Sequence, residues 1–562
     1  RARALRALAR WLERAASAIC GPGGCGGCLQ DSGEFAVSSR VLESIDQQTP
    51  QRRRSAVDIL SLLRRPGPPR SVGGSYRFTA HLGDGAFSSV FLAESTSTGE
   101  NFAIKCIQKP DSREKMNFLC AELETMLSLD HPNIAKFHEY LEDQHTLRLV
   151  TEWCTEGDYS QLSRHCDSLQ EIRRLFRDVV KAVAYCHDHG VVHRDLKFEN
   201  CLIQREPQQP RTGKVIDFGL AAIRRPGDPS GPWLSEQLGT HYFIAPEVIS
   251  SGRQYGAKCD CWSLGVMLYV LLTDEHPFAA DAQSLDTAQL FRKVLQNAVR
   301  VQPLEGTVED SARDLLLQLL QKDPERRLDS RSVLFHEWLG APKVDTEQQS
   351  SSRHCSDRRQ SQPSSFGSSF GSAPGSFGSP VPLDEHLTSR IRSFGALSRF
   401  ERTVLTLAAH HASAKDVASL QATFFQLDSS RDGSLSGDEL RAAIDRSGRE
   451  ISEEDFAELF RSLDADGDGK VNYTDWLAAT MRPSLVASST AVAYVWSFFD
   501  REGDGQVDGE KLQRVLGRNR AFSGVLRSHE AGGDCFFNKL QFGDLMRDVA
   551  DAVEKRASGQ AR

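Results

Sequence analysis

Three short motifs in the middle of the chain carry side chains suited to binding and transferring a phosphoryl group. Residues 193–200 read HRDLKFEN, residues 217–219 read DFG, and residues 245–247 read APE. The carboxylates of Asp195 and Asp217 and the amide of Asn200 are groups that a reacting hydroxyl and Mg²⁺ ions require. Each motif alone could be a structural turn, but the three in this order form a specific signature.

A glycine-rich turn and a lysine lie upstream of these motifs. Residues 82–90 read LGDGAFSSV, in which Ser88 stands where GxGxxG has its third glycine. Glycines let backbone amides approach phosphate oxygens, although taken alone this stretch is more often an ordinary hairpin. Lys105 ends the apolar run FAIK, where a buried ammonium needs an anionic partner. Glu122 could provide one.

The elements around the motifs predict a two-lobed α+β domain. Short β-branched and aromatic runs come first, at residues 76–91, 101–107 and 147–151, and helical periodicity follows as far as residue 339. Residues 76–339 resemble a eukaryotic serine/threonine protein kinase. The resemblance implies an ATP-dependent phosphotransferase that uses Mg²⁺ and acts on protein substrates.

The resemblance also implies roles for individual residues. Lys105, held by Glu122, would bind the α and β phosphates of ATP. Asp195 would orient the substrate hydroxyl and accept its proton, and Lys197 would neutralise the γ-phosphate. The two Mg²⁺ ligands would be Asn200 and Asp217. The residues expected around ATP are Leu82, Gly83, Asp84, Gly85, Ala86, Phe87, Ser88, Ser89, Val90, Lys105, Thr151 and Glu152.

Four further residues are expected to support the kinase. Asp158 and Glu199 match positions that contact an upstream arginine in basophilic kinases, because carboxylates pair well with guanidinium groups. The resulting hypothesis is a preference for R-x-x-S/T. Asp260 and Arg326 match scaffold positions, and we expect Arg326 to pair with Glu247.

Aspartate-rich loops recur in the last third of the chain, beginning at Asp428, Asp464 and Asp500, 36 residues apart each time. An EF-hand loop takes oxygen ligands at positions 1, 3, 5, 7, 9 and 12, with glycine at position 6. The first loop matches with Asp428, Ser430, Asp432, Ser434, Ser436 and Glu439. The second matches with Asp464, Asp466, Asp468, Lys470, Asn472 and Asp475, and its shorter last carboxylate would let Mg²⁺ compete with Ca²⁺.

The third and fourth loops depart from this pattern. The doubtful Ca²⁺ ligands of the third loop are Asp500, Glu502, Asp504, Gln506 and Asp508. Lys511 stands at position 12, where an ammonium replaces the bidentate carboxylate, so weak or absent Ca²⁺ binding is expected. The fourth copy, residues 530–541, keeps only a hydrophobic frame. The loops should pair through short strands, Leu435 with Val471 and Val507 with Phe537.

A basic amphipathic segment precedes the first loop. Apolar residues recur three or four apart at Leu387, Ile391, Phe394, Leu397, Phe400, Val404 and Leu407. This pattern predicts one helix of the kind that calmodulin-like lobes bind, and a packing helix of the tail is the alternative. Kinase, junction and EF-hands together resemble a calcium-dependent protein kinase. In that family's pattern the junction blocks the substrate cleft at low Ca²⁺ and is withdrawn when the lobes fill.

Two other functions remain open on these residues. One is a calcium-sensing scaffold with an inactive kinase fold, although the presence of Lys105, Asp195, Asn200 and Asp217 argues against it. The other is a kinase controlled by separate calmodulin, with its own EF-hands serving only as structure.

The charge distribution supports this organisation. The net charge of the chain is −8, but its ends differ: residues 1–75 hold 12 Arg against six acidic residues, and residues 401–562 hold 20 basic against 27 acidic residues. This argues against a nucleic-acid-binding protein with one continuous basic face.

The longest apolar run, residues 266–272, is far short of the ~18 residues of a membrane span. Cysteines fall at no paired spacing, so a reducing, cytoplasmic location is expected.

The expected domains follow from these patterns. A basic N-terminal extension (1–75) precedes the kinase domain (76–339) and a Ser/Gly-rich linker (340–382). An autoinhibitory junction helix (383–412) precedes two EF-hand pairs (413–480 and 481–550) and a C-terminal tail (551–562). The basic, leucine-containing residues 1–19 are compatible with membrane association or a transit-like peptide, and residues 20–28 are best explained as a Gly-rich linker.

Overall fold

The computed structural model describes residues 75–340 and 385–557, with several internal gaps. The gaps are residues 86–87, 109–121, 124, 127, 143–145, 163–167, 206–209, 224–239, 251–254, 307, 447–450, 465–466, 501–503, 509–510 and 513–535. The expected N-terminal extension and Ser/Gly-rich linker, and the last residues of the tail, lie outside the described residues.

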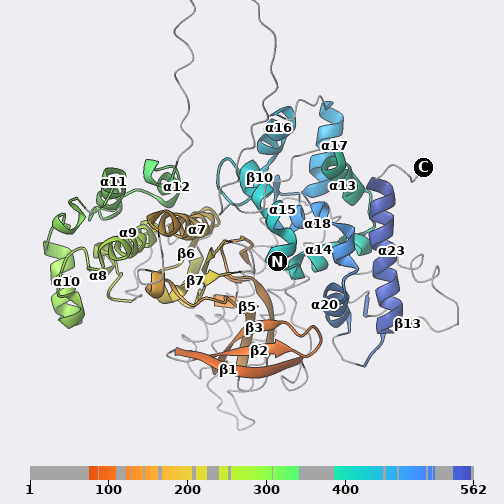
Figure 1. Cartoon of the computed structure of the whole chain (residues 1–562), viewed down its shortest axis with the longest axis horizontal. Helices are drawn as coiled ribbons and strands as arrows, with labels where there is room; N and C mark the ends of the chain where they lie inside the picture. Colours follow the sequence, from red (N-terminus) through yellow and green to blue (C-terminus); the bar gives the residue numbers. More distant parts are fainter. Residues whose placement is uncertain are drawn as a thin grey trace, which may run out of the picture.

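An antiparallel sheet of five strands forms the first lobe (Figure 1). In sequence order its strands are β1 (Tyr76–Gly85), β2 (Ser88–Ser95), β3 (Asn101–Gln108), β4 (Phe137–Glu142) and β5 (Thr146–Glu152). Their spatial order is β1-β2-β3-β5-β4, so β3 lies at the centre. Ala93, Ile104 and Val150 are buried together on one side of the sheet. Alternation along β3 then sends Lys105 to the opposite side.

Helices and short strands form the second lobe. They are η1 (Tyr159–Gln161), α7 (Leu169–Asp188), β6 (Val191–Val192), η2 (Phe198–Asn200), β7 (Cys201–Gln204), β8 (Thr212–Val215), β9 (Ala222–Ile223), α8 (Pro246–Ile249), α9 (Lys258–Thr273), η3 (Ala282–Ser284), α10 (Thr287–Gln296), η4 (Gln302–Leu304), α11 (Asp310–Leu319), α12 (Ser330–Leu334) and η5 (Glu337–Leu339). Helix α9 is buried along most of its length, as a helix without a polar face must be. Gly265 lets it approach α11, since an added Cβ would lie 2.9 Å from Leu319 Cβ.

The EF-hand region is helical with two small strand pairs. Its elements are α13 (Glu385–Gly395), α14 (Arg399–His411), α15 (Ala414–Leu427), β10 (Leu435–Ser436), α16 (Gly437–Arg446), α17 (Glu453–Leu463), β11 (Lys470–Val471), α18 (Tyr473–Thr480), α19 (Pro483–Val486), α20 (Ser489–Phe499), β12 (Val507–Asp508), β13 (Phe536–Phe537) and α23 (Lys539–Ala557). Leu435 pairs with Val471 and Val507 with Phe537, which confirms both expected strand pairs.

The expectation of a single junction helix is wrong, because the segment forms two helices, α13 and α14. Helix α13 ends at Gly395, and a capping box of Ser398 and Glu401 starts α14. The apolar residues of both helices are buried in one core with the EF-hands. Helix α13 packs on α17, α18 and α23, and α14 packs on α18, α19 and α20. In this structure the junction is therefore part of the EF-hand region.

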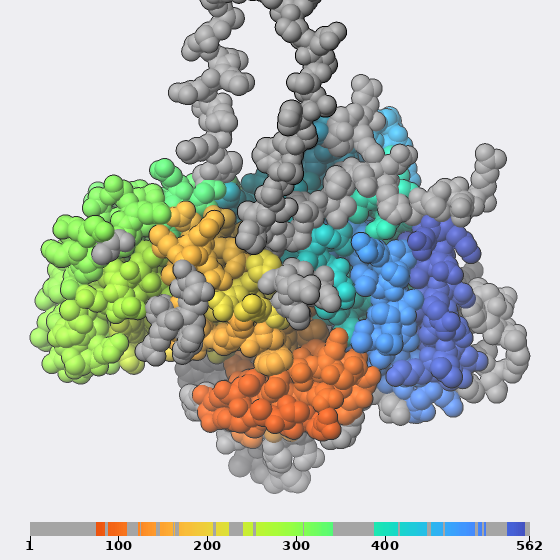
Figure 2. Space-filling model, viewed as in Figure 1, coloured from red at the N-terminus to blue at the C-terminus, as the bar shows by residue number. Residues whose placement is uncertain are grey.

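The EF-hand region lies beside the kinase and contacts both of its lobes (Figure 1). In the space-filling view, the lighter blue surface that includes α20 adjoins the orange surface of the first sheet (Figure 2), and Tyr494 of α20 lies near His138 of β4. Among the described helices, none is both long and apolar enough to cross a membrane.

Candidate active site and calcium-binding loops

Lys105 faces two carboxylates from its place on the central strand. It is paired with Val90 of β2 and Leu149 of β5, and these neighbours fix the direction of its side chain. Its Nζ donates to Glu122 Oε1 at 2.7 Å and to Asp217 Oδ1 at 2.7 Å. Burial disfavours the ammonium, but the two carboxylates outweigh burial and raise the pKa of Lys105. Lys105 therefore stays charged where an anionic ligand could meet it.

Asp195 accepts hydrogen bonds at both of its carboxylate oxygens. Its Oδ2 accepts from Lys197 Nζ at 2.8 Å and from Asn200 Nδ2 at 3.2 Å. Its Oδ1 accepts from the backbone N of Thr240 at 2.8 Å and from Thr240 Oγ1 at 2.7 Å. Thr240 is not among the residues that the motifs predict. Its only sequence signal is its place five residues before Ala245 of the APE motif.

A buried aspartate of α9 positions the backbone before Asp195. Asp260 accepts from the backbone N of His193 at 2.8 Å and of Arg194 at 2.9 Å, and its Oδ2 lies 2.9 Å from His187 Nε2. Burial opposes its charge, but these hydrogen bonds, that of His187 first, lower the pKa of Asp260. Arg194 is held at a φ of 68°, a left-handed conformation that costs energy outside glycine. Asp260 therefore has the scaffold place expected of it.

The glycine-rich stretch forms the hairpin between β1 and β2. Gly83 lies opposite Val90 and Asp84 lies opposite Ser89, whose Oγ donates to Asp84 Oδ1 at 2.6 Å. Gly85 pairs with Ser88, and the expected site residues Ala86 and Phe87 lie outside the described residues. Leu82 is exposed on β1.

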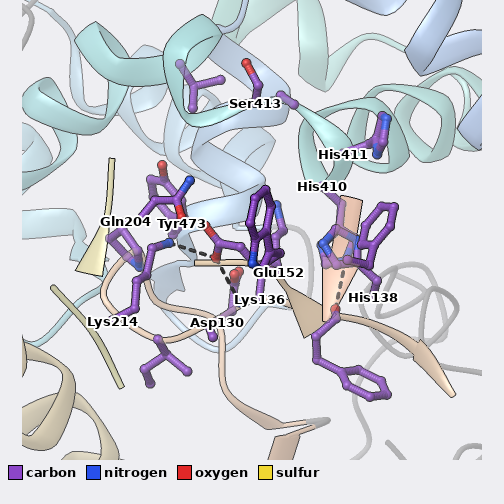
Figure 3. A pocket seen from close by; sticks show the side chains of 18 of the residues that line it. Asp130, Lys136, His138, Glu152, Gln204, Lys214, His410, His411, Ser413 and Tyr473 are labelled. Carbon is purple, nitrogen blue, oxygen red and sulfur yellow. Dashed lines mark hydrogen bonds and ion pairs between the residues drawn. The ribbon is translucent and has the colours of Figure 1, made fainter. Parts of the chain in front are cut away.

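Thr151 and Glu152 end β5, where the two lobes join. Thr151 Oγ1 donates to Ala103 O at 3.3 Å. Glu152 Oε2 accepts from Lys214 Nζ at 2.9 Å and from the backbone N of Lys136 at 3.1 Å. These bonds hold the Glu152 side chain toward the EF-hand region, as Figure 3 shows. The Glu152 side chain is therefore engaged by Lys136 and Lys214 of the kinase itself.

Asp158 and Glu199 lie on two short helical turns that contact each other. Asp158 caps η1 by accepting from the backbone N of Ser160 at 2.8 Å. Glu199 is exposed in η2, one residue before Asn200. Asp158 and Glu199 thus lie on adjacent turns, and η2 directly follows the Asp195 loop.

The partner of Glu247 is Arg327, and the expected pairing with Arg326 is wrong. Arg327 Nη1 and Nη2 donate to Glu247 Oε1 and Oε2 at 2.6 and 2.9 Å, and the two side chains are 0% and 5% exposed. Arg326 is exposed instead. The turn after α11 directs Arg327 inward and leaves Arg326 at the surface. Because the two residues are adjacent and identical, the sequence does not show which of them is buried.

In the first EF-hand loop, backbone hydrogen bonds hold the carboxylates of the first and last predicted ligands, Asp428 and Glu439. Asp428 accepts from the backbone N of Asp432 and of Gly433, both at 3.0 Å. Glu439 accepts from the backbone N of Ser430 at 2.7 Å and of Ser436 at 2.9 Å. Burial raises the pKa of Asp428 to about 7, and the carboxylates of Asp432 and Glu439 add to this rise. This crowding of negative charge fits a divalent cation.

The remaining predicted ligands of that loop follow the same frame. Ser434 Oγ donates to Asp432 Oδ1 at 2.7 Å, and Ser436 Oγ donates to Glu439 Oε2 at 2.8 Å. Within the described residues, no three His, Cys, Asp or Glu side chains are arranged as a finished metal centre. In this structure, hydrogen bonds within the loop hold the side chains of Asp432 and Glu439 in place.

The second loop has the same turn but a more exposed first ligand. Asp464 accepts from the backbone N of Gly467, Asp468 and Gly469 at 2.7, 3.1 and 3.0 Å. Asp466 lies outside the described residues. Asn472 precedes α18, in which Asp475 is buried. The backbone N of Lys470 donates to Asp468, and its Nζ reaches Asp432 Oδ2 of the first loop at 2.8 Å.

The third loop contains a basic side chain among its predicted ligands. Asp500, Asp504, Gln506 and Asp508 surround Lys511, which is only 6% exposed, while Glu502 lies outside the described residues. This arrangement does not fit Ca²⁺, because the buried ammonium of Lys511 lies among oxygens from three of the ligand positions. Lys470, by contrast, touches one ligand oxygen of the first loop, and its side chain is 44% exposed.

The first loop also forms part of the contact with the kinase. Arg431 Nη1 donates to Leu334 O at the end of α12, and its guanidinium lies 4.9 Å from the ring centre of Phe335. A Cβ on Gly433, whose φ is 77°, would lie 2.5 Å from Tyr185 Cδ2 and 2.6 Å from His131 Cδ2. The loop turn therefore packs directly against α7 of the kinase.

Two more contacts extend this interface on either side of the loop. Lys181 Nζ of α7 lies 3.9 Å from the ring centre of Phe425. Asp130 accepts from the backbone N and Oγ1 of Thr474 at 3.1 and 3.0 Å. Both EF-hands of the first pair therefore touch the kinase.

A cavity of about 390 Å³ lies between the hinge of the kinase and α14. Figure 3 shows His410 and His411 of α14 on one side and Lys136, Glu152 and Lys214 on the other. His410 Nε2 lies 3.2 Å from Phe137 O, and His411 Nε2 lies 2.9 Å from Glu100 Oε2. The junction thus reaches the kinase behind the hinge.

Comparison with known proteins agrees with this architecture. A protein kinase domain matches residues 76–339, and an EF-hand domain pair matches residues 418–481. Calcium-dependent protein kinase 12 of Arabidopsis thaliana is 30% identical over 397 residues, which cover 69% of this chain and 72% of the relative. Calcium-dependent protein kinase 20 of Oryza sativa subsp. japonica is 30% identical over 401 residues, which cover 70% and 65%.

These similarities span the kinase domain and extend into the EF-hand region. Protein kinases of this type transfer phosphate from ATP with the help of Mg²⁺, and EF-hands bind Ca²⁺. With the paired Lys105 and the aspartate-rich loops described above, the chain belongs to the calcium-dependent protein kinases, which are serine/threonine kinases joined to EF-hands.

Proposed function

We propose that this chain transfers the γ-phosphate of ATP to serine and threonine hydroxyls through the residues gathered around Asp195. The observation that supports this most is the Lys105–Glu122 ion pair of 2.7 Å, which also reaches Asp217. Lys105 binds the α and β phosphates from this position. Asp217 and Asn200 hold Mg²⁺, which neutralises phosphate charge when bound.

Asp195 orients the substrate hydroxyl and accepts its proton. Lys197 donates to the other oxygen of the same carboxylate and supplies a positive charge toward the γ-phosphate. Thr240 holds both groups, because its Oγ1 contacts Asp195 at 2.7 Å and Lys197 Nζ at 3.0 Å. Thr240 therefore acts as a positioning residue.

Asp158 and Glu199 give the site its preference for an upstream arginine. Both carboxylates lie on contacting turns next to the Asp195 loop, and Glu199 is exposed. A guanidinium is the group that such carboxylates bind best. A peptide array should show selection for Arg three residues before the target hydroxyl, and Glu199→Gln should weaken it. Equal phosphorylation of peptides with and without that Arg would contradict this assignment.

Calcium controls the kinase through the first EF-hand pair and the junction. The supporting observation is that the first loop carries both the calcium ligands and the contacts of Arg431 and Gly433 with the kinase. At low Ca²⁺ the junction blocks the substrate cleft. When the loops bind Ca²⁺, α13 and α14 are held in the EF-hand core, as they are placed here, and the cleft is open.

Phosphorylation of a basic peptide with and without Ca²⁺ tests both parts of the proposal. The wild-type rate should rise with Ca²⁺, Asp195→Ala should abolish it, and Glu439→Gln should shift the response to higher Ca²⁺. Asp438→Asn is the matched control, because Asp438 is the exposed neighbour of Glu439 and not a predicted ligand.

Each alternative function has its own outcome in this assay. Activity that survives Asp195→Ala would contradict the catalytic assignment, and no activity in the wild type would favour an inactive scaffold. A rate that responds only after calmodulin is added would favour control by separate calmodulin.

We also propose a cytoplasmic location with membrane contact through residues 1–19. The support is compositional, since this segment holds five Arg and one acidic residue. Sedimentation with anionic vesicles should be lost when the segment is deleted, and equal sedimentation of both chains would contradict it.

A further inference from the structure

The third EF-hand loop contains a buried ammonium in the place where an EF-hand holds its metal ion. Lys511 Nζ donates to Asp504 Oδ1 at 2.5 Å and to Gln506 O at 2.7 Å, and it lies 3.6 Å from Asp500 Oδ1. These oxygens belong to loop positions 5, 7 and 1, which are three of the positions that supply calcium ligands. One side chain thus reaches the centre of the loop from position 12.

The rest of the loop keeps the frame of a working EF-hand. Gly505 has a φ of 76° and donates its backbone N to Asp500 Oδ2 at 3.0 Å, as Gly433 does to Asp428 in the first loop. Val507 is buried and pairs with Phe537. The loop is therefore folded around a centre of positive charge.

The first and third loops differ in the side chain at position 12, which is Glu439 in the first and Lys511 in the third. In the first loop Glu439 brings a third carboxylate, so that Asp428, Asp432 and Glu439 together favour a divalent cation. In the third loop the ammonium of Lys511 brings one positive charge and three N–H donors to two carboxylates and a carbonyl. A buried ammonium requires such partners.

We infer that Lys511 is an internal substitute for calcium, which keeps the third EF-hand in its folded loop form whether or not calcium is present. The second EF-hand pair then keeps one form with and without Ca²⁺, and it includes α23, the helix on which α13 packs here. Calcium changes only the first pair, which is the pair that contacts the kinase. This inference concerns the loop itself and does not depend on the phosphotransfer assignment.

Hydrogen–deuterium exchange of the full chain tests this inference at β12, the strand inside the third loop. In the wild type, exchange there should be slow in EGTA and unchanged by Ca²⁺. Lys511→Met removes the ammonium, so exchange should rise about tenfold or more with and without Ca²⁺. Lys539→Met is the matched control, because Lys539 is exposed at the start of α23, and it should leave exchange unchanged.

A third variant tests whether the loop can still bind Ca²⁺ once the ammonium is replaced by a carboxylate. Lys511→Glu restores the position-12 carboxylate, so it should exchange rapidly in EGTA, become protected by Ca²⁺, and bind one more Ca²⁺ than the wild type in calorimetry. Calcium-dependent protection of β12 in the wild type would overturn the inference. So would equal exchange of Lys511→Met and Lys539→Met, or no extra Ca²⁺ and no protection in Lys511→Glu.

Discussion

The buried ion pair between Arg327 and Glu247 gives a sharp prediction of stability and activity. Arg327→Met keeps much of the side-chain volume but leaves Glu247, 6% exposed, as a buried charge without its bidentate partner. It also removes the bonds of Arg327 to Lys258 O at 2.8 Å and Gln321 O at 2.9 Å. Breaking a buried pair from one side costs about 3–5 kcal/mol.

A loss of this size should be large in a thermal assay. For a domain of this length, 1 kcal/mol lowers Tm by about 2–4 °C, so Arg327→Met should lower the Tm of the kinase domain by roughly 6–20 °C. Residual kinase activity after short heat pulses follows this domain separately from the EF-hands. The same change should also weaken activity at ambient temperature, because Glu247 belongs to the APE motif that follows Thr240, the residue in contact with Asp195.

The neighbouring arginine is the control for this prediction. Arg326→Met changes the same residue type one position away, and it should alter stability by no more than about 0.5 kcal/mol because Arg326 is exposed. Adding Glu247→Gln to Arg327→Met should recover part of the loss by removing the orphaned charge. The reasoning is refuted if both arginine variants unfold alike, or if Arg327→Met unfolds at the wild-type temperature.

Three further predictions follow from contacts that the motifs do not reveal. Thr240→Val removes the hydroxyl that donates to Asp195. If Asp195 acts as proposed, kcat should fall roughly tenfold with little change in Tm, whereas a purely structural role of Thr240 would lower Tm instead. Gly433→Ala and Gly469→Ala both place alanine in a left-handed conformation, which costs about 1–2 kcal/mol. Only the added Cβ at Gly433 would meet the kinase, so only Gly433→Ala should increase hydrogen exchange in α7. Similar exchange in both variants would contradict the interface. Gly213→Ala would place Cβ 2.1 Å from Tyr159 Oη, so chemical denaturation should show that the free energy of unfolding falls by about 2–4 kcal/mol. An unchanged free energy of unfolding would contradict this and show that the hydroxyl moves aside.

Local sequence patterns determined the chemistry of this protein. The order of HRDLKFEN, DFG and APE predicted a kinase, and the spacing of the aspartate-rich loops predicted EF-hands. The strand pairs of Leu435 with Val471 and Val507 with Phe537 were also predictable. A 12-residue loop with glycine at position 6 leaves position 8 only one place to pair.

Other features were decided by contacts between residues far apart in the sequence. Arg326 and Arg327 differ only in which way a turn directs them, and Glu247 lies 80 residues away. The hydrophobic period of the junction continues through the break between α13 and α14, so periodicity alone predicts one helix where the cap at Ser398 and the surrounding EF-hands produce two.

The position of Lys511 shows the same division. Its place in the sequence predicts poor calcium binding, because an ammonium cannot act as a calcium ligand. Only the folded loop brings Nζ back to Asp504, seven residues earlier, and to the carbonyl of Gln506. Sequence spacing thus reports which groups are available for a site, whereas burial and the closing of the loop decide which of them meet, because an ammonium and a calcium ion compete for the same few oxygens.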